Sequence, residues 1–106
     1  MEIQMIRNEA LKFIMPGDRD KINIPRWFRN ESVEHKQMKQ DICNKLYAEG
    51  KSFICEARLT GMVGRADIVC LDDMTIIEVV KSESEESILL KNKKYPKQFK
   101  LVVAKC

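Results

Sequence analysis

The sequence predicts an α/β domain in which a mixed β-sheet is flanked by helices. The first observation is the order of patterns along the chain, which reads helix, three strands, helix and strand. The second is the balance of the 106 residues, 44% hydrophobic and 33% charged, which is typical of a single globular domain. The third is that no apolar run approaches the roughly 20 residues that a membrane span needs, so no membrane partner is expected.

Residues 1–29 are interpreted as an N-terminal extension that packs on the core or on a partner chain. A short helix or strand is plausible here, and Pro16-Gly17-Asp18 ends it with turn chemistry. Trp27 and Phe28 are interpreted as packing residues rather than as residues that stack on bases. The domain itself is predicted to span residues 30–106.

The clearest helix is predicted over residues 31–49. Asn30 is a good N-cap, and Glu31 and Glu34 place negative charge at the positive end of the helix dipole. Gly50 suits the position that ends a helix. Apolar residues at helical spacing form the stripe that is expected to be buried: Val33, Met38, Ile42, Leu46 and Tyr47.

Three strands are predicted next, over residues 52–59, 65–71 and 74–80. Short turns rich in Gly or Asp separate them, which favours an antiparallel meander. Alternation places four residues of the first strand on one face: Phe53, Cys55, Ala57 and Leu59.

A second helix is predicted over residues 83–94. Ser82 and Glu85 form a capping box at its start, and Tyr95-Pro96 stops it. Residues 99–105 then have the pattern of a buried strand. Because a helix crosses over before this strand, we expect the strand to join the sheet parallel to a neighbour.

The cysteines and the known sequence fingerprints exclude several classes of protein. None of the four cysteines belongs to a C-x-x-C pair, which predicts reduced thiols, a cytoplasmic location and no zinc finger. The first residues include acids and lack the apolar run of a signal peptide. No phosphate-binding loop or dinucleotide fingerprint is present, so no organic cofactor is expected.

The net charge of +3 hides an uneven distribution. Residues 31–90 carry twelve Asp or Glu against seven Lys or Arg, whereas residues 91–106 carry six Lys and no acid. This tail favours contact with a polyanion, and ordinary solvated surface charge is the alternative interpretation. The lysines expected to contact nucleic-acid phosphates are interleaved with aromatic residues: Lys91, Lys93, Lys94 and Lys97.

Two acids, Asp67 and Glu78, occupy the interiors of adjacent predicted strands. A carboxylate among branched apolar residues is costly unless it is paired or bound to a metal. Mg²⁺ takes one or two carboxylates and leaves its other positions to water and phosphate oxygens. With Lys81 following the second acid, the pattern favours metal-dependent phosphodiester hydrolysis. The alternative is that each acid pairs with a neighbouring cation such as Arg58 or Arg65.

These residues lie in two segments that resemble the core of the PD-(D/E)xK nuclease superfamily, which includes archaeal Holliday-junction resolvases and RecB-type nuclease domains. The segments are Gly64-Arg65-Ala66-Asp67-Ile68-Val69 and Ile76-Ile77-Glu78-Val79-Val80-Lys81-Ser82. The resemblance covers residues 30–106 and implies a restriction-endonuclease-like αβββαβ core. It also implies that Asp67 and Glu78 are metal ligands and that Glu34 helps to hold the metal or its water.

The chain departs from the superfamily pattern, Glu-x-Lys, because Val80 stands where the lysine is expected. Lys81 comes one residue later and faces the opposite side of a regular strand. A β-bulge near Val80 would return Lys81 to the site. Alternatively, Lys91 or Lys94 of the following helix replaces it, or the lysine is lost and the domain no longer cuts.

The sequence therefore predicts a nuclease that depends on Mg²⁺ or Mn²⁺ and acts on DNA as a homodimer. So short a chain has little room for a separate recognition domain, which favours substrates recognised by structure, such as a junction, flap or end. The expected catalytic residues are Asp67, Glu78, Lys81 and Glu34. Glu56 is a further candidate or a cross-strand partner of Arg65, and His35 is interpreted as a helix-surface residue. The alternative function is a catalytically inactive nuclease-fold protein that binds nucleic acid or serves in assembly.

Overall fold

Four strands form one mixed sheet in the order β1-β2-β3-β4. The strands are β1 (Phe53–Leu59), β2 (Gly64–Cys70), β3 (Thr75–Val80) and β4 (Lys100–Lys105). The first three pair antiparallel as a meander, and β4 pairs parallel to β3. The computed structural model describes residues 2–27, 30–81 and 84–106. The predicted mixed α/β class, the meander and the parallel fourth strand are confirmed.

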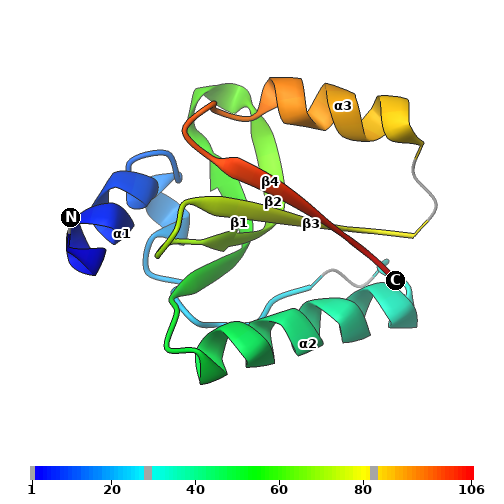
Figure 1. Cartoon of the computed structure of the whole chain (residues 1–106), viewed down its shortest axis with the longest axis horizontal. Coiled ribbons are helices and arrows are strands. Elements are labelled where there is room, and N and C mark those ends of the chain that lie inside the picture. Colours follow the sequence, from blue (N-terminus) through cyan, green and yellow to red (C-terminus); the bar gives the residue numbers. More distant parts are fainter. Residues whose placement is uncertain (1, 28–29, 82–83) are drawn as a thin grey trace.

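Helices cover both faces of the sheet. The described helices are α1 (Ile3–Leu11), α2 (Val33–Ala48) and α3 (Glu85–Lys94), with 3₁₀ turns η1 (Pro16–Asp18) and η2 (Thr60–Met62). α2 and α3 lie on opposite sides of the sheet, and α1 lies to one side of it (Figure 1). In the described part of the chain, no helix is long and apolar enough to cross a membrane.

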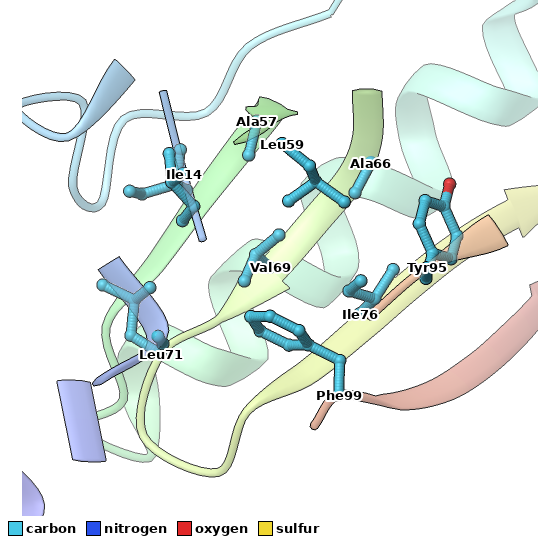
Figure 2. Packing of buried hydrophobic residues seen from close by; sticks show 11 residues of the cluster. Ile14, Ala57, Leu59, Ala66, Val69, Leu71, Ile76, Tyr95 and Phe99 are labelled. Carbon is cyan, nitrogen blue, oxygen red and sulfur yellow. The ribbon is translucent and has the colours of Figure 1, made fainter. Parts of the chain in front are cut away.

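The larger apolar cluster fills the face opposite α2. Its members come from the end of α1, from the first three strands and from the segment after α3, and their side chains converge in Figure 2. The rings of Phe13 and Phe99 meet edge to face, with centroids 5.3 Å apart. Ala10 and Ile14 are fully buried in this cluster, so the N-terminal segment packs on the sheet.

A smaller cluster lies between the sheet and α2. Cys43 and Leu46 of α2 pack there against apolar residues of the strands, namely Phe53, Cys55, Ile68, Cys70 and Ile77. Cys43, Cys55 and Cys70 are buried free thiols, and Cys106 is an exposed free thiol. Of the predicted stripe on α2, Val33 and Tyr47 are exposed instead, because the sheet covers only one side of the helix.

Both helix starts differ from the predicted ones. α2 begins two residues later than predicted, because Ser32 rather than Asn30 is the N-cap and its Oγ accepts a hydrogen bond from the His35 N–H. The N-cap of α3 is Ser84, whose Oγ accepts from the Ser87 N–H. The predicted capping box at Ser82 lies outside the described residues, as does Phe28.

The alternation predicted for the first strand is wrong, because it breaks at Glu56. Phe53 and Cys55 pack on the α2 side, whereas Ala57 and Leu59 pack in the cluster on the opposite side. Glu56 adopts φ +52°, a left-handed conformation that is uncommon outside glycine and that changes which face the following residues occupy. This irregular position directs the Glu56 side chain into a polar network.

Among the described residues, the pairing of β3 with β4 shows no bulge that would turn Lys81 toward the face of Glu78. The parallel register between β3 and β4 runs without interruption from the pair Thr75 and Lys100 to the pair Val80 and Lys105. Lys81 follows at the end of the strand, and its ammonium lies 3.7 Å from a carboxylate oxygen of Glu34 on α2. The regular strand therefore places Lys81 on the α2 side.

Candidate functional site

Asp67 and Glu78 meet where the pairing of β2 with β3 stops. The ladder covers only three residue pairs and ends at Ile68 and Ile77. Beyond it, the Asp67 N–H donates to Glu78 Oε2 at 3.1 Å, and the Val79 N–H donates to Asp67 Oδ2 at 2.8 Å. The two carboxylates thus replace the next backbone hydrogen bonds of the sheet, and this exchange holds them beside each other.

Burial and charge both act on Glu78. The residue is only 4% exposed, and the Tyr95 hydroxyl donates a hydrogen bond to its Oε1. Burial, followed by the negative charge of Asp67, raises the pKa of Glu78 to about 7. A cation that binds to this carboxyl group near neutral pH therefore competes with its proton.

This pKa predicts a pH-dependent stability. The folded-state pKa lies above the ordinary value of 4.5, so the stabilising contribution is complete below that value and is lost as the pH rises through about 7. Without divalent cations, the free energy of unfolding of the native protein should fall relative to that of Glu78→Gln by up to about 3 kcal/mol between about pH 5 and about pH 8. Chemical denaturation in EDTA measures this, with Glu86→Gln at an exposed position as the control. Parallel pH profiles for native protein and Glu78→Gln would contradict the raised pKa.

A pocket of about 390 Å³ opens beside the two acids. Its lining combines carboxylates, cations and one aromatic residue: Glu31, Glu56, Arg65, Asp67, Glu78, Lys91, Lys94 and Tyr95. Its volume falls within the usual range for ligand pockets, about 300–1,000 Å³. The pocket is therefore large enough for a phosphate group and its sugar beside the acids.

Lys91 and Lys94 reach this pocket from α3. The end of the Lys94 side chain lies over Gly64, because a Cβ at Gly64 would come within 2.8 Å of the Lys94 Nζ. Gly64 also has φ +125°, which a residue with a side chain rarely adopts. Glycine at the start of β2 thus permits both the turn and the close approach of this lysine. Lys93 and Lys97 are exposed and do not line the pocket.

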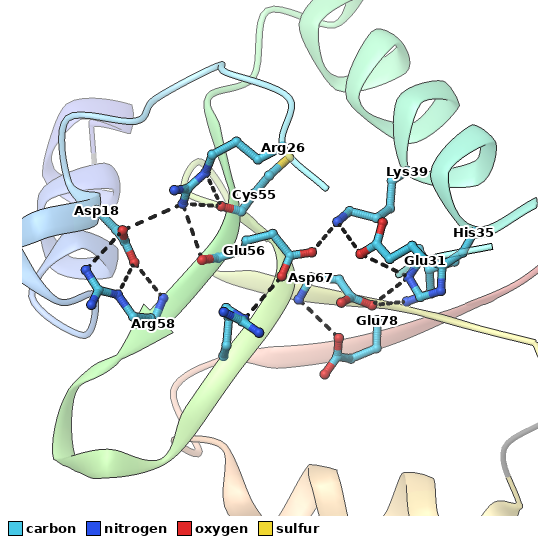
Figure 3. A network of polar contacts seen from close by, with 12 residues as sticks. Asp18, Arg26, Glu31, His35, Lys39, Cys55, Glu56, Arg58, Asp67 and Glu78 are labelled. Atoms are coloured by element: carbon cyan, nitrogen blue, oxygen red, sulfur yellow. Dashed lines mark hydrogen bonds and ion pairs between the residues drawn. The ribbon is translucent and has the colours of Figure 1, made fainter. Parts of the chain in front are cut away.

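A network of ion pairs runs from the pocket to the N-terminal half of α2 (Figure 3). Lys39, 1% exposed, donates to Glu56 and to Glu31, with the second contact at 3.1 Å. Arg65 Nε lies 3.3 Å from the other oxygen of Glu56. His35 Nε2 lies 3.6 Å from Asp67 Oδ2, so α2 also contacts the carboxylate pair itself. The predicted pairing of Glu56 with Arg65 is present, and Lys39 is added to it.

Glu34 and Lys81 do not line this pocket. They pair with each other at the surface, where both side chains are more than half exposed. The acid that reaches the pocket from this region is Glu31, which precedes the N-cap Ser32. The sequence could have indicated Glu31 only through the N-cap. If Ser32 rather than Asn30 is taken as the cap, the helix begins two residues later and Glu31 lies before it. Lys39 gave no such signal, because lysine on a helix is usually exposed.

A divalent cation fits the donors of this pocket. Two adjacent ionised carboxylates repel, and a cation between them removes that cost. Glu31 Oε2 is a buried oxygen to which the described residues donate no hydrogen bond, and Glu31 lines the same pocket. Within residues 2–27, 30–81 and 84–106, no three His, Cys, Asp or Glu side chains gather as a metal-binding group. Asp67 and Glu78 both line the pocket and would supply the one or two carboxylates that Mg²⁺ takes.

Comparison with protein-family models, with curated proteins and with solved structures found no match to this chain.

Proposed function

We propose that this protein is a metal-dependent nuclease that hydrolyses phosphodiester bonds in DNA. The observation that carries the proposal is the pair of buried Glu78 and partly exposed Asp67, which lines a pocket that two lysines of α3 also line. Each of the two carboxylates accepts a backbone N–H from the other residue's strand, so both are held beside the pocket. A pocket lined by both acids and cations suits a phosphate bridged through a metal ion.

Each part of the pocket has a role in this proposal. Asp67 and Glu78 would hold Mg²⁺ or Mn²⁺, which supplies Lewis-acid stabilisation of the phosphate and activation of a water molecule. Lys91 and Lys94 would neutralise the phosphate charge that develops during the displacement. Tyr95 orients Glu78 through its hydroxyl.

The resemblance to the PD-(D/E)xK superfamily is part of the same proposal. The element order helix, three strands, helix, strand supports a restriction-endonuclease-like core. We further propose that the lysine function has moved from β3 to α3, because Lys81 lies at the surface and Lys94 lies over Gly64.

The direct test is incubation of the protein with labelled junction, flap, single-stranded and duplex DNA in the presence of Mg²⁺, Mn²⁺ or EDTA. Cleavage with either metal and none with EDTA is expected. If no DNA form is cut under any of these conditions, the enzyme proposal fails.

The position of the catalytic lysine gives a separate prediction. Lys94→Ala should lower the cleavage rate by about 100-fold, the usual effect of removing one group that stabilises transition-state charge. Lys81→Ala should leave the rate within about twofold, since its ammonium pairs with exposed Glu34. Single-turnover cleavage measures both. A large loss of rate with Lys81→Ala and little loss with Lys94→Ala would instead identify Lys81 as the catalytic lysine.

Salt dependence tests the basic surface. Binding of DNA should weaken steeply as salt rises, with a slope that reflects the number of phosphates that the protein neutralises. Replacing Lys93, Lys94 and Lys97 together by Gln should reduce that slope by about 0.9 for each phosphate that is no longer neutralised. Fluorescence anisotropy over a salt series measures the slope, and Lys12→Gln on the segment after α1, where Lys12 pairs with Glu9, is the control. An unchanged slope would place the DNA on another surface.

The second candidate function is DNA binding without cleavage, by a protein that serves in recognition or assembly. The placement of Lys81 away from the carboxylate pair favours it. This protein would show the same salt dependence but no cleavage with either metal. The cleavage panel therefore separates the two candidates.

A further inference from the structure

A second pocket, of about 330 Å³, adjoins the one that contains the carboxylate pair. Its lining includes three arginines and the only tryptophan of the chain: Asp18, Arg26, Trp27, Glu56, Arg58 and Arg65. Glu56 and Arg65 line both pockets, so the two form one continuous surface around β1 and β2. In Figure 3 the polar contacts run across this surface from Asp18 and Arg58 through Arg26 and Glu56 toward Asp67.

Trp27 is not part of either apolar cluster. It is 47% exposed, and it borders both this second pocket and a shallow groove against α2. About half of this residue's surface therefore remains available for contact with a ligand. An exposed tryptophan among arginines has the composition of surfaces that stack on nucleobases.

The arginines around Trp27 are held in place. Arg58 donates from Nε and Nη2 to the two oxygens of Asp18, at 3.1 and 3.4 Å, while its side chain stays 56% exposed. Gly17 permits this position, since a Cβ there would lie 2.9 Å from Arg58 Nη2. Arg26 donates to the carbonyl oxygens of Cys55 and Glu56. These hydrogen bonds fix the guanidinium groups while part of each arginine still lines the pocket, and bases stack on guanidinium planes.

The charge of the second pocket also favours a strand of nucleic acid. Its acids are Asp18 and Glu56, both buried and both engaged by cations of the protein. Burial raises the pKa of Asp18, but hydrogen bonds from Arg58 and the charges of Arg58 and Arg26 outweigh it and lower that pKa. Asp18 thus holds Arg58 and Arg26 in position, and these arginines are the charged groups that would contact a ligand in the pocket.

We propose that this second pocket receives an unpaired nucleobase, stacked on Trp27, from a DNA strand whose backbone crosses the Asp67–Glu78 pair. This rests on the proposed nuclease function and names its substrate class, which is DNA with a single-stranded segment at the cut. A base inside a duplex is stacked on both sides and must first be extruded, at a cost of a few kcal/mol. An unpaired base at a flap, frayed end or branch avoids that cost, so such substrates are preferred over perfect duplex.

Because Trp27 is the only tryptophan, its fluorescence reports stacking directly. The probe is a short thymidine oligonucleotide, titrated into the native protein in EDTA so that no cleavage occurs. A strand of equal length with abasic sites is the matched control, because it keeps the phosphates and lacks the bases. Quenching by the thymidine strand and little change with the abasic strand is expected. Equal changes with both strands, or no change with either while anisotropy shows binding, would overturn the inference.

Substitutions provide an independent readout by anisotropy. Trp27→Ala should weaken binding of the thymidine strand by about tenfold to a hundredfold, the range found for removal of one stacking aromatic residue. It should leave binding of the abasic strand within about twofold, since the phosphate contacts remain. Tyr47→Ala, at an exposed aromatic residue of α2 outside the pocket, is the control. If Trp27→Ala weakens both strands equally, the ring has no contact with a base.

Failure of this inference differs from failure of the proposed function. If the protein binds and cleaves DNA but the fluorescence of Trp27 does not change, only the stacking pocket is rejected. Quenching by the thymidine strand without cleavage under any metal condition rejects hydrolysis and keeps the pocket. If DNA neither binds nor is cut, both are rejected.

Discussion

Asp67→Asn and Glu78→Gln are each expected to lower the rate of DNA cleavage by about three orders of magnitude or more. Each substitution removes a carboxylate of the pair that would hold the metal ion, and each keeps the shape of the side chain. The amide at position 67 can still accept the hydrogen bond from the Val79 N–H, so the end of the β2–β3 ladder should persist. Single-turnover cleavage of a labelled flap with Mg²⁺ measures the effect.

Binding and folding are the controls for this prediction. Both variants should bind DNA in EDTA as tightly as the native protein or more tightly, because each removes a negative charge near the phosphates. Asp41→Asn, at an exposed position of α2 where the carboxylate accepts from Gln37, should cut normally. Full cleavage by either Asp67→Asn or Glu78→Gln would show that this carboxylate pair is not the catalytic centre.

Lys39→Met is expected to lower the free energy of unfolding by about 3–5 kcal/mol, the cost of breaking a buried ion pair from one side. Methionine fills most of the volume of the lysine stem but supplies no charge. Glu56 and Glu31 would then face each other without the cation that joins them. Burial already raises the pKa of Glu56, as do the charges of Asp67 and Glu31, and the bond from Lys39 opposes this rise. Urea denaturation near neutral pH measures the loss.

The pairing of Lys39 with Glu56 can be separated from simple loss of packing. Lys39→Met combined with Glu56→Gln should recover more than half of the lost stability, because no uncompensated charge remains at Glu56. Lys45→Met, at an exposed position of α2, should change the free energy of unfolding by less than about 0.5 kcal/mol. If Lys39→Met also changes the free energy of unfolding by less than about 0.5 kcal/mol, water rather than the Lys39 ammonium solvates the carboxylates of Glu56 and Glu31.

The elements of the fold were predicted because their signals are local. Gly50 after α2, Pro96 after α3 and the turns between strands act through the backbone conformations of single residues. The parallel pairing of β4 followed from the crossover helix, which is a rule of chain connection. The same local signals were ambiguous at the start of α2, where Asn30 and Ser32 are both good caps. The choice between them depends on contacts with the sheet, and it decides that Glu31 rather than Glu34 reaches the pocket.

The candidate site was predicted only in part, for a different reason. Asp67 and Glu78 were conspicuous because an acid in a strand interior is costly, whatever surrounds it. Lys39 and Trp27 were not conspicuous, since the sequence does not show that one is buried between carboxylates and the other is exposed among arginines. Lys81 was expected near the acids only if a β-bulge near Val80 returned it there, and the regular pairing of β3 with β4 leaves it on the opposite face.

From residue 30 onward, the order and type of the helices and strands, the pairing of the strands and the two acids of the candidate site follow from the amino-acid sequence alone. They depend on short-range preferences and on the cost of burying charge. Which cations surround the pocket depends on the packing of the whole chain, because Lys39 and Arg65 pair with Glu56, Lys94 lines the pocket, and the three come from α2, β2 and α3. The energy of an ion pair varies with a distance of a few ångströms between its charges, and that distance is set by how the helices and the sheet pack.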